Sequence, residues 1–93
     1  MKPAIPFGSR VIITSTLEKV QQYHHGRTET NYESRALFVP LHGIYIGYRT
    51  AQTGYTRYDE DGPQFKPTGK IRYFLVVTSE RKNPVKVAVL TPE

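Results

Sequence analysis

The sequence predicts a mainly β protein, a small SH3-like barrel of five to six antiparallel strands. β-branched and aromatic residues recur in short runs, many with the alternation that is typical of strands. No stretch of a dozen residues places apolar side chains at helical spacing. Seven glycines and seven prolines fall mainly between the runs and indicate turns. Because short strands expose their edges unless the sheet closes on itself, we expect a barrel.

The chain length indicates a single domain over residues 1–93, because 93 residues support one hydrophobic core but not two. Hydrophobic residues make up 38% of the chain, well above the content of a disordered protein. The chain has no cysteine, so packing or self-association must stabilise it, and a homo-oligomer remains open. The lack of cysteine also favours a reducing compartment, and we expect a cytoplasmic protein.

The sequence predicts no membrane association. Pro3 and Pro6 interrupt the region in which an export signal needs an unbroken apolar segment. The longest apolar runs, 73–77 and 87–90, are far shorter than the roughly 20 residues that cross a bilayer.

The first predicted strand covers residues 10–17 and extends to residue 20 in one interpretation. Val11, Ile13 and Leu17 alternate with polar or outward positions and are expected to face the core. Residues 21–34 are polar and form either a mobile loop or the tip of a long hairpin, and we expect this segment to be the least ordered.

Two further strands are expected in the middle of the chain. Residues 36–41 form a short strand that Pro40 ends, and residues 43–50 form a strand that bends at Gly47.

Turn residues then divide the segment that follows. A turn at Thr53–Gly54 precedes a returning strand over 55–58, and the acidic residues 59–61 with Gly62–Pro63 form a second turn. Residues 64–69 are expected to be an irregular connector. The last pair of strands, 71–78 and 85–90, is the clearest hairpin, because the polar residues 79–84 have the length of a hairpin linker.

Three segments resemble those of small SH3-like barrel proteins encoded by bacteriophages: 43–50, 65–69 and 81–87. The resemblance covers the C-terminal half and involves turn and strand residues rather than catalytic signatures. It implies the barrel fold and an accessory role, and it transfers no active site.

The sequence does not indicate an enzyme, a metal site or a cofactor. It lacks the phosphate-binding, dinucleotide-binding, zinc-protease and nucleophile-elbow motifs. His24 and His25 are adjacent and, with His42, give no fixed geometry for a metal. The acidic residues 59–61 fit a solvated turn. An enzyme that uses this turn or a histidine is only a third hypothesis, because no nucleophile, base and orienting group can be assembled.

Aromatic and basic residues are interleaved across the middle and the end of the chain. Tyr45 and Arg49 are expected to share one strand face, as are Tyr55 and Arg57, while Arg72 lies opposite the core face of its strand. If these strands are neighbours, the side chains form a platform that stacks bases and pairs phosphates. The alternative is that the tyrosines cover the core, and the same patch would equally serve a protein partner.

The formal net charge of +5 favours anionic partners. Residues 66–86 include six basic residues and only one acidic residue, Glu80. Some of these cations could contact a phosphate backbone or simply keep a hairpin edge soluble.

The first functional hypothesis is therefore non-catalytic binding of an anionic ligand, nucleic acid or nucleotide. The expected ligand-binding residues are Tyr45, Arg49, Tyr55, Arg57, Arg72, Lys70, Arg81, Lys82 and Lys86. The alternative hypothesis is a phage-type accessory protein or inhibitor that binds a host protein, for example a component of a defence system.

Overall fold

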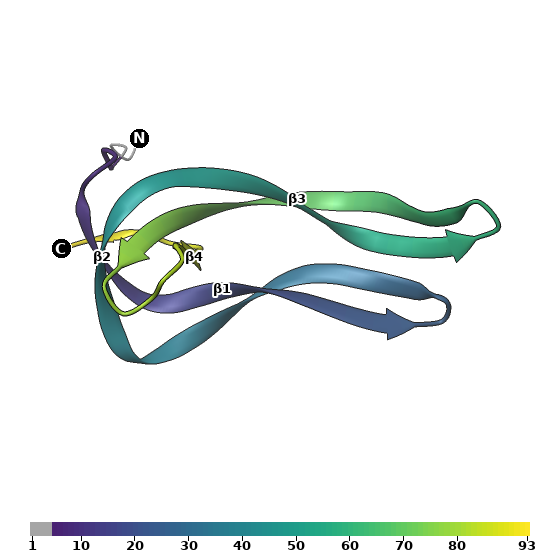
Figure 1. The fold of residues 1–93 in the computed structure, drawn as a ribbon, viewed down its shortest axis with the longest axis horizontal. Helices are drawn as coiled ribbons and strands as arrows, with labels where there is room; N and C mark the ends of the chain where they lie inside the picture. Colours follow the sequence, from purple (N-terminus) through teal and green to yellow (C-terminus); the bar gives the residue numbers. More distant parts are fainter. Residues whose placement is uncertain (1–4) are drawn as a thin grey trace.

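The computed structural model describes residues 5–93 and forms a single antiparallel sheet. Its strands run in the order β4-β3-β2-β1-β5 across the sheet (Figure 1). They are β1 (Arg10–His24), β2 (Arg27–Asp59), β3 (Gly62–Thr78), β4 (Val85–Val87) and β5 (Thr91–Pro92). The described residues contain no helix, and hence no helix that could cross a membrane.

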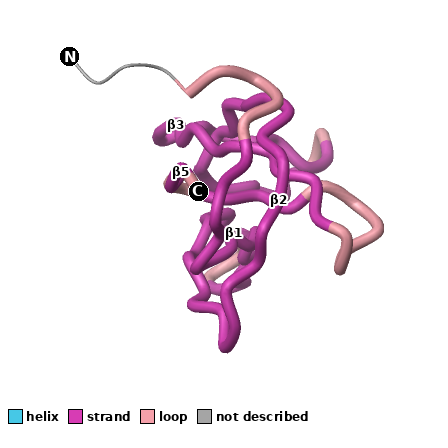
Figure 2. Tube along the Cα trace, turned by 90° about the vertical axis from the view of Figure 1, so that its left-hand side faces the viewer, coloured by secondary structure: helices cyan, strands magenta, loops and turns pink. Residues whose placement is uncertain are grey.

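The prediction of a mainly β, antiparallel fold is confirmed, but the sheet is not closed. Its two outermost strands are β4 and β5, and no pairing joins them within residues 5–93. Seen from the end of the molecule, the sheet is strongly curved, and β5 lies between β1 and β3 in this view (Figure 2). Most of the hydrogen-bonding potential is used instead in two long hairpins.

The long strand β2 bends back on itself and belongs to both hairpins. Its residues 27–44 pair with β1 and its residues 43–59 pair with β3. Both hairpin turns therefore lie at the same end of the molecule, which measures 50 × 31 × 21 Å (Figure 1). We call residues 15–36 the first arm and residues 50–72 the second arm. The opposite end, which holds the C-terminus and the start of β1, is the base.

Two β-bulges in β2 allow this bend. While β1 advances from Ile13 to Ser15, β2 runs from Leu41 to Ala36, so residues 37–40 bulge out of the ladder. The prediction that Pro40 ends a strand is wrong, because a bulge needs no ladder hydrogen bond from the proline. The second bulge lies between Tyr45 and Gly47, the place where the sequence predicted a bend.

The tips of the arms are tight turns. His25 and Gly26 have φ angles of 53° and 78°, as a two-residue hairpin turn of type I′ requires. The segment 21–34 is thus the tip of a long hairpin and not a loop. In the second arm, the predicted acidic turn is confirmed between Asp59 and Gly62, where Asp61 N donates a hydrogen bond to Asp59 Oδ1 at 2.9 Å.

Two predictions about the second arm are wrong. Residues 53–54 lie inside β2 and not in a turn, and residues 64–69 are part of β3 and not an irregular connector. Position 54 requires glycine for a different reason, because a Cβ there would lie 2.2 Å from the carbonyl oxygen of Lys66. Gly54 permits close approach of two strands rather than a change of direction.

The C-terminal hairpin is confirmed, with a shorter second strand than predicted. Phe74 pairs with Val87 and Val76 pairs with Val85, and residues 79–84 connect the strands. β4 ends at Val87 instead of residue 90.

The hydrophobic core lies at the base. Its buried members are Val11, Ile13, Tyr45, Val76, Val85 and Val87. The ring of Tyr45 lies 5.3 Å from that of Phe7 and 5.8 Å from that of Phe74, measured between centroids. Fully burying such a side chain contributes about 1.5–3 kcal/mol, so the base provides most of the hydrophobic stabilisation and the arms extend from it.

Candidate anion-binding site

The nine residues that the sequence proposed for ligand binding do not form one surface. Tyr45 is buried in the base with 4% of its surface exposed, so its assignment to an outer platform is wrong. The bulge at Ile46 adds one residue to β2 and reverses the alternation of its side chains. Tyr45 and Arg49 consequently lie on opposite faces of the sheet.

Tyr55 and Arg57 lie in the second arm and face the first arm. The guanidinium carbon Cζ of Arg27 sits 4.7 Å from the centroid of the Tyr55 ring. Tyr58 Oη lies 3.2 Å from Thr28 Oγ1, a second contact between the arms. Because Arg27 covers a face of the Tyr55 ring, that face serves to join the arms and is not free to stack a base.

Arg49, Lys70 and Arg72 lie along the middle of the molecule. The Cζ atom of Arg72 lies 4.9 Å from the centroid of the Tyr48 ring, and Arg49 Nη1 donates a hydrogen bond to the Tyr48 carbonyl oxygen at 3.0 Å. Lys70 is exposed in β3 opposite Gln52. None of these three cations lines the groove described next or the cleft between the tips of the arms.

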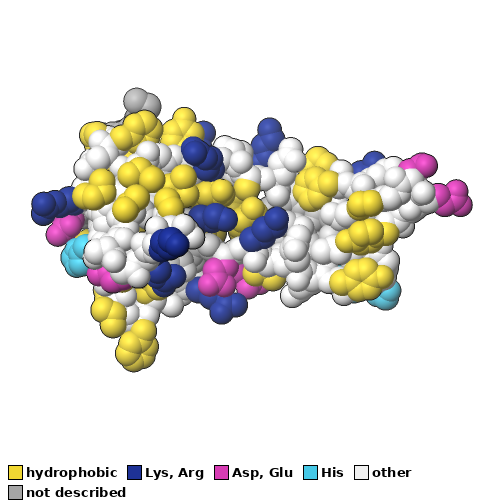
Figure 3. Space-filling model, in the orientation of Figure 1, with side chains coloured by type: hydrophobic (Ala, Val, Ile, Leu, Met, Phe, Trp, Pro, Cys, Tyr) yellow, Lys and Arg dark blue, Asp and Glu magenta, His cyan; other side chains and the backbone are white. Residues whose placement is uncertain are grey.

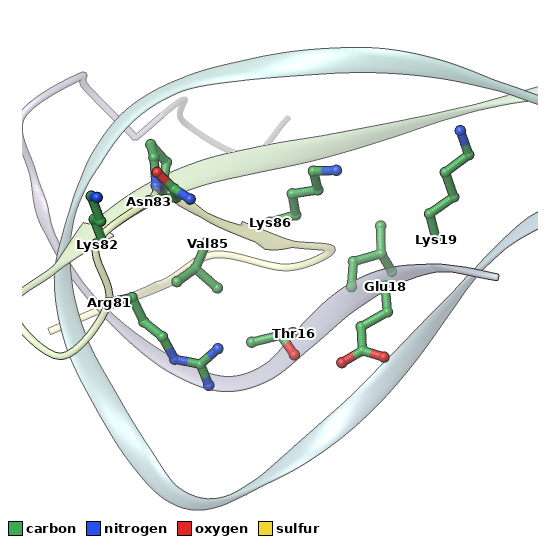
Figure 4. Close-up of a pocket in the computed structure, with 10 residues that line it drawn as sticks. Thr16, Glu18, Lys19, Arg81, Lys82, Asn83, Val85 and Lys86 are labelled. Carbon is green, nitrogen blue, oxygen red and sulfur yellow. The ribbon is translucent and has the colours of Figure 1, made fainter.

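The three remaining predicted residues line one groove. Arg81, Lys82 and Lys86 line a groove whose opposite wall is the segment Thr16–Lys19 of β1 (Figure 4). Asn83, Pro84 and Val85 complete the lining. The groove runs between β1 and the stretch that leads into β4. Lys19 is the cation that the sequence reasoning missed.

The cations that line the groove have no carboxylate partners among residues 5–93. Figure 4 shows the Lys19 and Lys86 side chains pointing in the same direction, with the Arg81 guanidinium beside Thr16. None of the four cations takes part in an ion pair within residues 5–93. The carboxylate in the wall, Glu18 Oε2, lies 2.8 Å from Arg35 Nε and points away from Lys19 and Lys86 in Figure 4.

The burial of Lys86 adds to the affinity that this groove can have for an anion. Lys86 is partly buried, and its Nζ lies 5.5 Å from the centroid of the Tyr73 ring. A cation that is partly removed from water and held by a ring is more ordered than a free surface lysine. On the face shown in Figure 3, most Lys and Arg side chains gather over the central part of the molecule.

A second cleft lies between the tips of the arms. It is lined by the turn His24–Arg27 of the first arm and by Tyr55, Arg57 and Tyr58 of the second. Glu29 lies within it and is within 3.2 Å of Arg27 Nη2 and 3.4 Å of His24 Nε2. Glu29 thus partners Arg27, and Arg57 is the one arginine of this cleft without an ion pair within residues 5–93, compared with four such cations in the groove. Residues 5–93 contain no group of three or more His, Cys, Asp and Glu side chains that could hold a metal ion.

Sequence reasoning could not find Lys19 because 62 positions separate it from Arg81. The one available signal was its position at the end of the first predicted strand, since lysine is frequent on exposed strand edges.

Comparison of the chain with protein-family profiles, curated proteins and solved structures found no match.

Proposed function

We propose that this chain is a non-catalytic binding module that recognises an anionic ligand in the groove between β1 and β4. The observation that carries the proposal is that four cations without carboxylate partners among residues 5–93 line the same groove: Lys19, Arg81, Lys82 and Lys86. Among the nine residues first considered, Arg81, Lys82 and Lys86 are the members that share a groove.

The chemistry of the groove suits binding rather than turnover. A concave surface whose cations outnumber its carboxylates, as here with Glu18 paired to Arg35, concentrates anions and speeds their association. Arginine binds carboxylate or phosphate through two parallel hydrogen bonds, whereas lysine acts as a point charge. Thr16 and Asn83 add neutral hydrogen-bonding groups at the same place. This set of side chains orients an anion.

We also propose that the fold is related to the small SH3-like barrels. The strongly curved antiparallel sheet supports a relationship to the SH3-like barrels of bacteriophages that the C-terminal half resembles. With it we propose a cytoplasmic accessory role, in which the anionic ligand is a nucleic acid or nucleotide, or a segment of a host protein.

The test is the salt dependence of binding and its dependence on the groove. The probes are a fluorescein-labelled oligothymidylate of about 12 nucleotides and a labelled acidic peptide, titrated by fluorescence anisotropy. The double variant Arg81→Ala, Lys86→Ala should weaken the tighter probe at least about tenfold at low salt, and the wild-type affinity should fall as salt rises.

The matched control is Lys66→Ala, Lys70→Ala, which removes the same charge from exposed positions on the second arm, outside the groove. If the two double variants lose the same affinity, the protein attracts anions only through its net charge and the groove is not a site.

A protein partner is the second candidate, and the bulge at residues 37–40 favours it. Phe38 is completely exposed, at 104% of its reference area, and Val39 is 65% exposed. A protruding aromatic ring fits the anchor of an interface, in which such a side chain fills an apolar pocket on the partner. In this second candidate function, the protein partner binds the bulge at residues 37–40 and not the groove.

Its test is affinity capture after nuclease treatment, with a matched pair of variants. One stoichiometric protein should be captured by the wild type and by Val89→Ser, in which the altered side chain is 73% exposed in another part of the chain. The same protein should be lost with Phe38→Ser. Capture that is equal for both variants would exclude the bulge as the anchor.

A further inference from the structure

The outer edge of β1 is unpaired along the first arm. On this side, β1 pairs with β5 only at Val11 and Ile12, and Glu93 N donates to the carbonyl oxygen of Arg10 at 3.2 Å. From Ser15 to His24, β1 has no strand on this side among residues 5–93. An unpaired edge of this length exposes a row of N–H and C=O groups that can accept another strand.

The turn of the first arm determines which of these groups point outward. A two-residue hairpin closes on a hydrogen-bonded pair, here His24 and Arg27. Pairs alternate between hydrogen-bonded and non-hydrogen-bonded along an antiparallel ladder. Counting back by this rule, Leu17 and Lys19 direct their backbone N–H and C=O groups away from β2.

The same stretch of β1 is a wall of the cationic groove. Residues Thr16–Lys19 line it on one side, and Val85 and Lys86 line it on the other. The outward backbone groups of Leu17 and Lys19 are thus next to the unpaired cations. A ligand that fills the groove meets a bare strand edge and positive side chains at once.

This combination suits a peptide better than a nucleic acid. Outward groups recur every second residue, about 6.8 Å apart, which is the repeat of an added β-strand. No aromatic side chain lines the groove, whereas proteins that bind single-stranded nucleic acid stack its bases on aromatic rings. The Tyr73 ring is outside the lining and is already in contact with Lys86.

We infer that the ligand of the groove is an extended acidic peptide segment, which adds as a strand to the edge of β1 at Ser15–Lys19 while Arg81, Lys82 and Lys86 pair with its carboxylates. This inference rests on the proposed function and specifies its ligand. Main-chain hydrogen bonds would supply affinity, and the charges would supply selection for acidic side chains.

The first experiment varies the peptide. The probe is a fluorescein-labelled peptide of about eight residues in which Glu and Thr alternate, so that in a strand the Glu side chains lie on one face and the Thr side chains on the other. Two comparison peptides have the same sequence and are N-methylated at every second residue, one on each edge of the strand. Methylation keeps the charge and removes the backbone N–H donors of the methylated edge. We expect N-methylation on the pairing edge to weaken binding at least about tenfold, and methylation on the other edge to have little effect.

An oligothymidylate of equal charge separates the two ligand classes. We expect it to bind more weakly than the unmethylated peptide at the same salt concentration. Tighter binding of the oligothymidylate would overturn the inference in favour of a nucleic-acid ligand. Equal binding of both methylated peptides would also overturn it, and would leave the proposed anion site intact if Arg81→Ala, Lys86→Ala still weakens them.

The second experiment varies the strand edge. Lys19→Pro removes the outward N–H without removing a hydrogen bond to β2, and Lys19→Ala removes the same charge but keeps the N–H. Lys19→Pro should bind the peptide at least about fivefold more weakly than Lys19→Ala and bind the oligothymidylate equally. Equal peptide affinity of the two variants would contradict strand addition. If circular dichroism shows that Lys19→Pro does not fold, the methylated peptides decide.

Discussion

At the scale of single residues, Tyr45 shows how one bulge changes the role of a side chain. The sequence pattern placed it beside Arg49 on an outer face, yet the extra residue Ile46 turns it into the core between Phe7 and Phe74. A regular strand would have kept the two residues on one face. Residue type alone could not distinguish these outcomes, because tyrosine suits both a core and a binding surface.

We therefore expect Tyr45→Ala to destabilise the fold by about 3–5 kcal/mol, the usual cost of removing a large aromatic side chain from a core. Urea denaturation followed by circular dichroism measures this change. Tyr48→Ala is the control, because 46% of the Tyr48 surface is exposed and its loss should cost much less. Equal costs would mean that Tyr45 is not a core residue.

Gly54 gives a second prediction at this scale. A Cβ at this position would lie 2.2 Å from the Lys66 carbonyl oxygen, a backbone atom that cannot move without separating the strands. Gly54→Ala should therefore destabilise the protein by about 1–3 kcal/mol, as overpacking does. Gly69→Ala is the control, since its Cβ would be 3.1 Å from a side-chain atom, Thr53 Oγ1. A smaller cost for Gly54→Ala than for Gly69→Ala in urea denaturation would contradict this reason for the glycine.

At the scale of elements, the sequence predicted the ends of the hairpins better than their lengths. The acidic turn near residue 60 and the last hairpin have local turn residues, and the structure has both. Pro40 and Gly54 were interpreted as interruptions, although both lie inside β2, Pro40 in the bulge at 37–40 and Gly54 where the register with β3 shifts. Local propensity marks a departure from regular pairing, and whether the strand continues beyond it depends on partners far away in the chain.

The contact between the arms is also an element-scale property. Arg27 from the first arm covers the Tyr55 ring of the second, and Tyr32 lies 6.2 Å from Tyr73 between ring centroids. We expect a double-mutant cycle of Arg27→Ala and Tyr55→Leu to give a coupling energy of about 0.5–1 kcal/mol, as for an exposed cation–π pair. Thermal or urea unfolding of the four proteins measures it, and additive effects would show that the arms do not stabilise each other through this pair.

At the scale of the whole molecule, the candidate site is assembled from opposite ends of the chain. Lys19 comes from β1, and Lys86 from β4, and the curvature of the sheet brings their strands to face each other across the groove. The sequence indicated a positive field in the C-terminal half, which is a sum over residues and needs no fold. It could not place that field in a groove, because the groove depends on where β2 bends.

The division between base and arms should appear in the hydrogen exchange of the whole protein. Val76 and Val87 belong to the core at the base, whereas the tips at 22–29 and 57–64 have few buried side chains. Amides of the base should exchange at the rate of global unfolding, and amides of the tips should exchange faster through local opening.

Addition of the alternating Glu-Thr peptide should then slow exchange selectively at Leu17 and Lys19, the positions whose N–H groups point away from β2. A strand added to this edge gives those amides new hydrogen-bond acceptors, whereas an anion held only by side chains would not. Amide exchange followed residue by residue by NMR distinguishes the two results. Uniform protection from base to tip in the free protein would contradict the division, and unchanged exchange at Leu17 and Lys19 with the peptide bound would contradict the added strand.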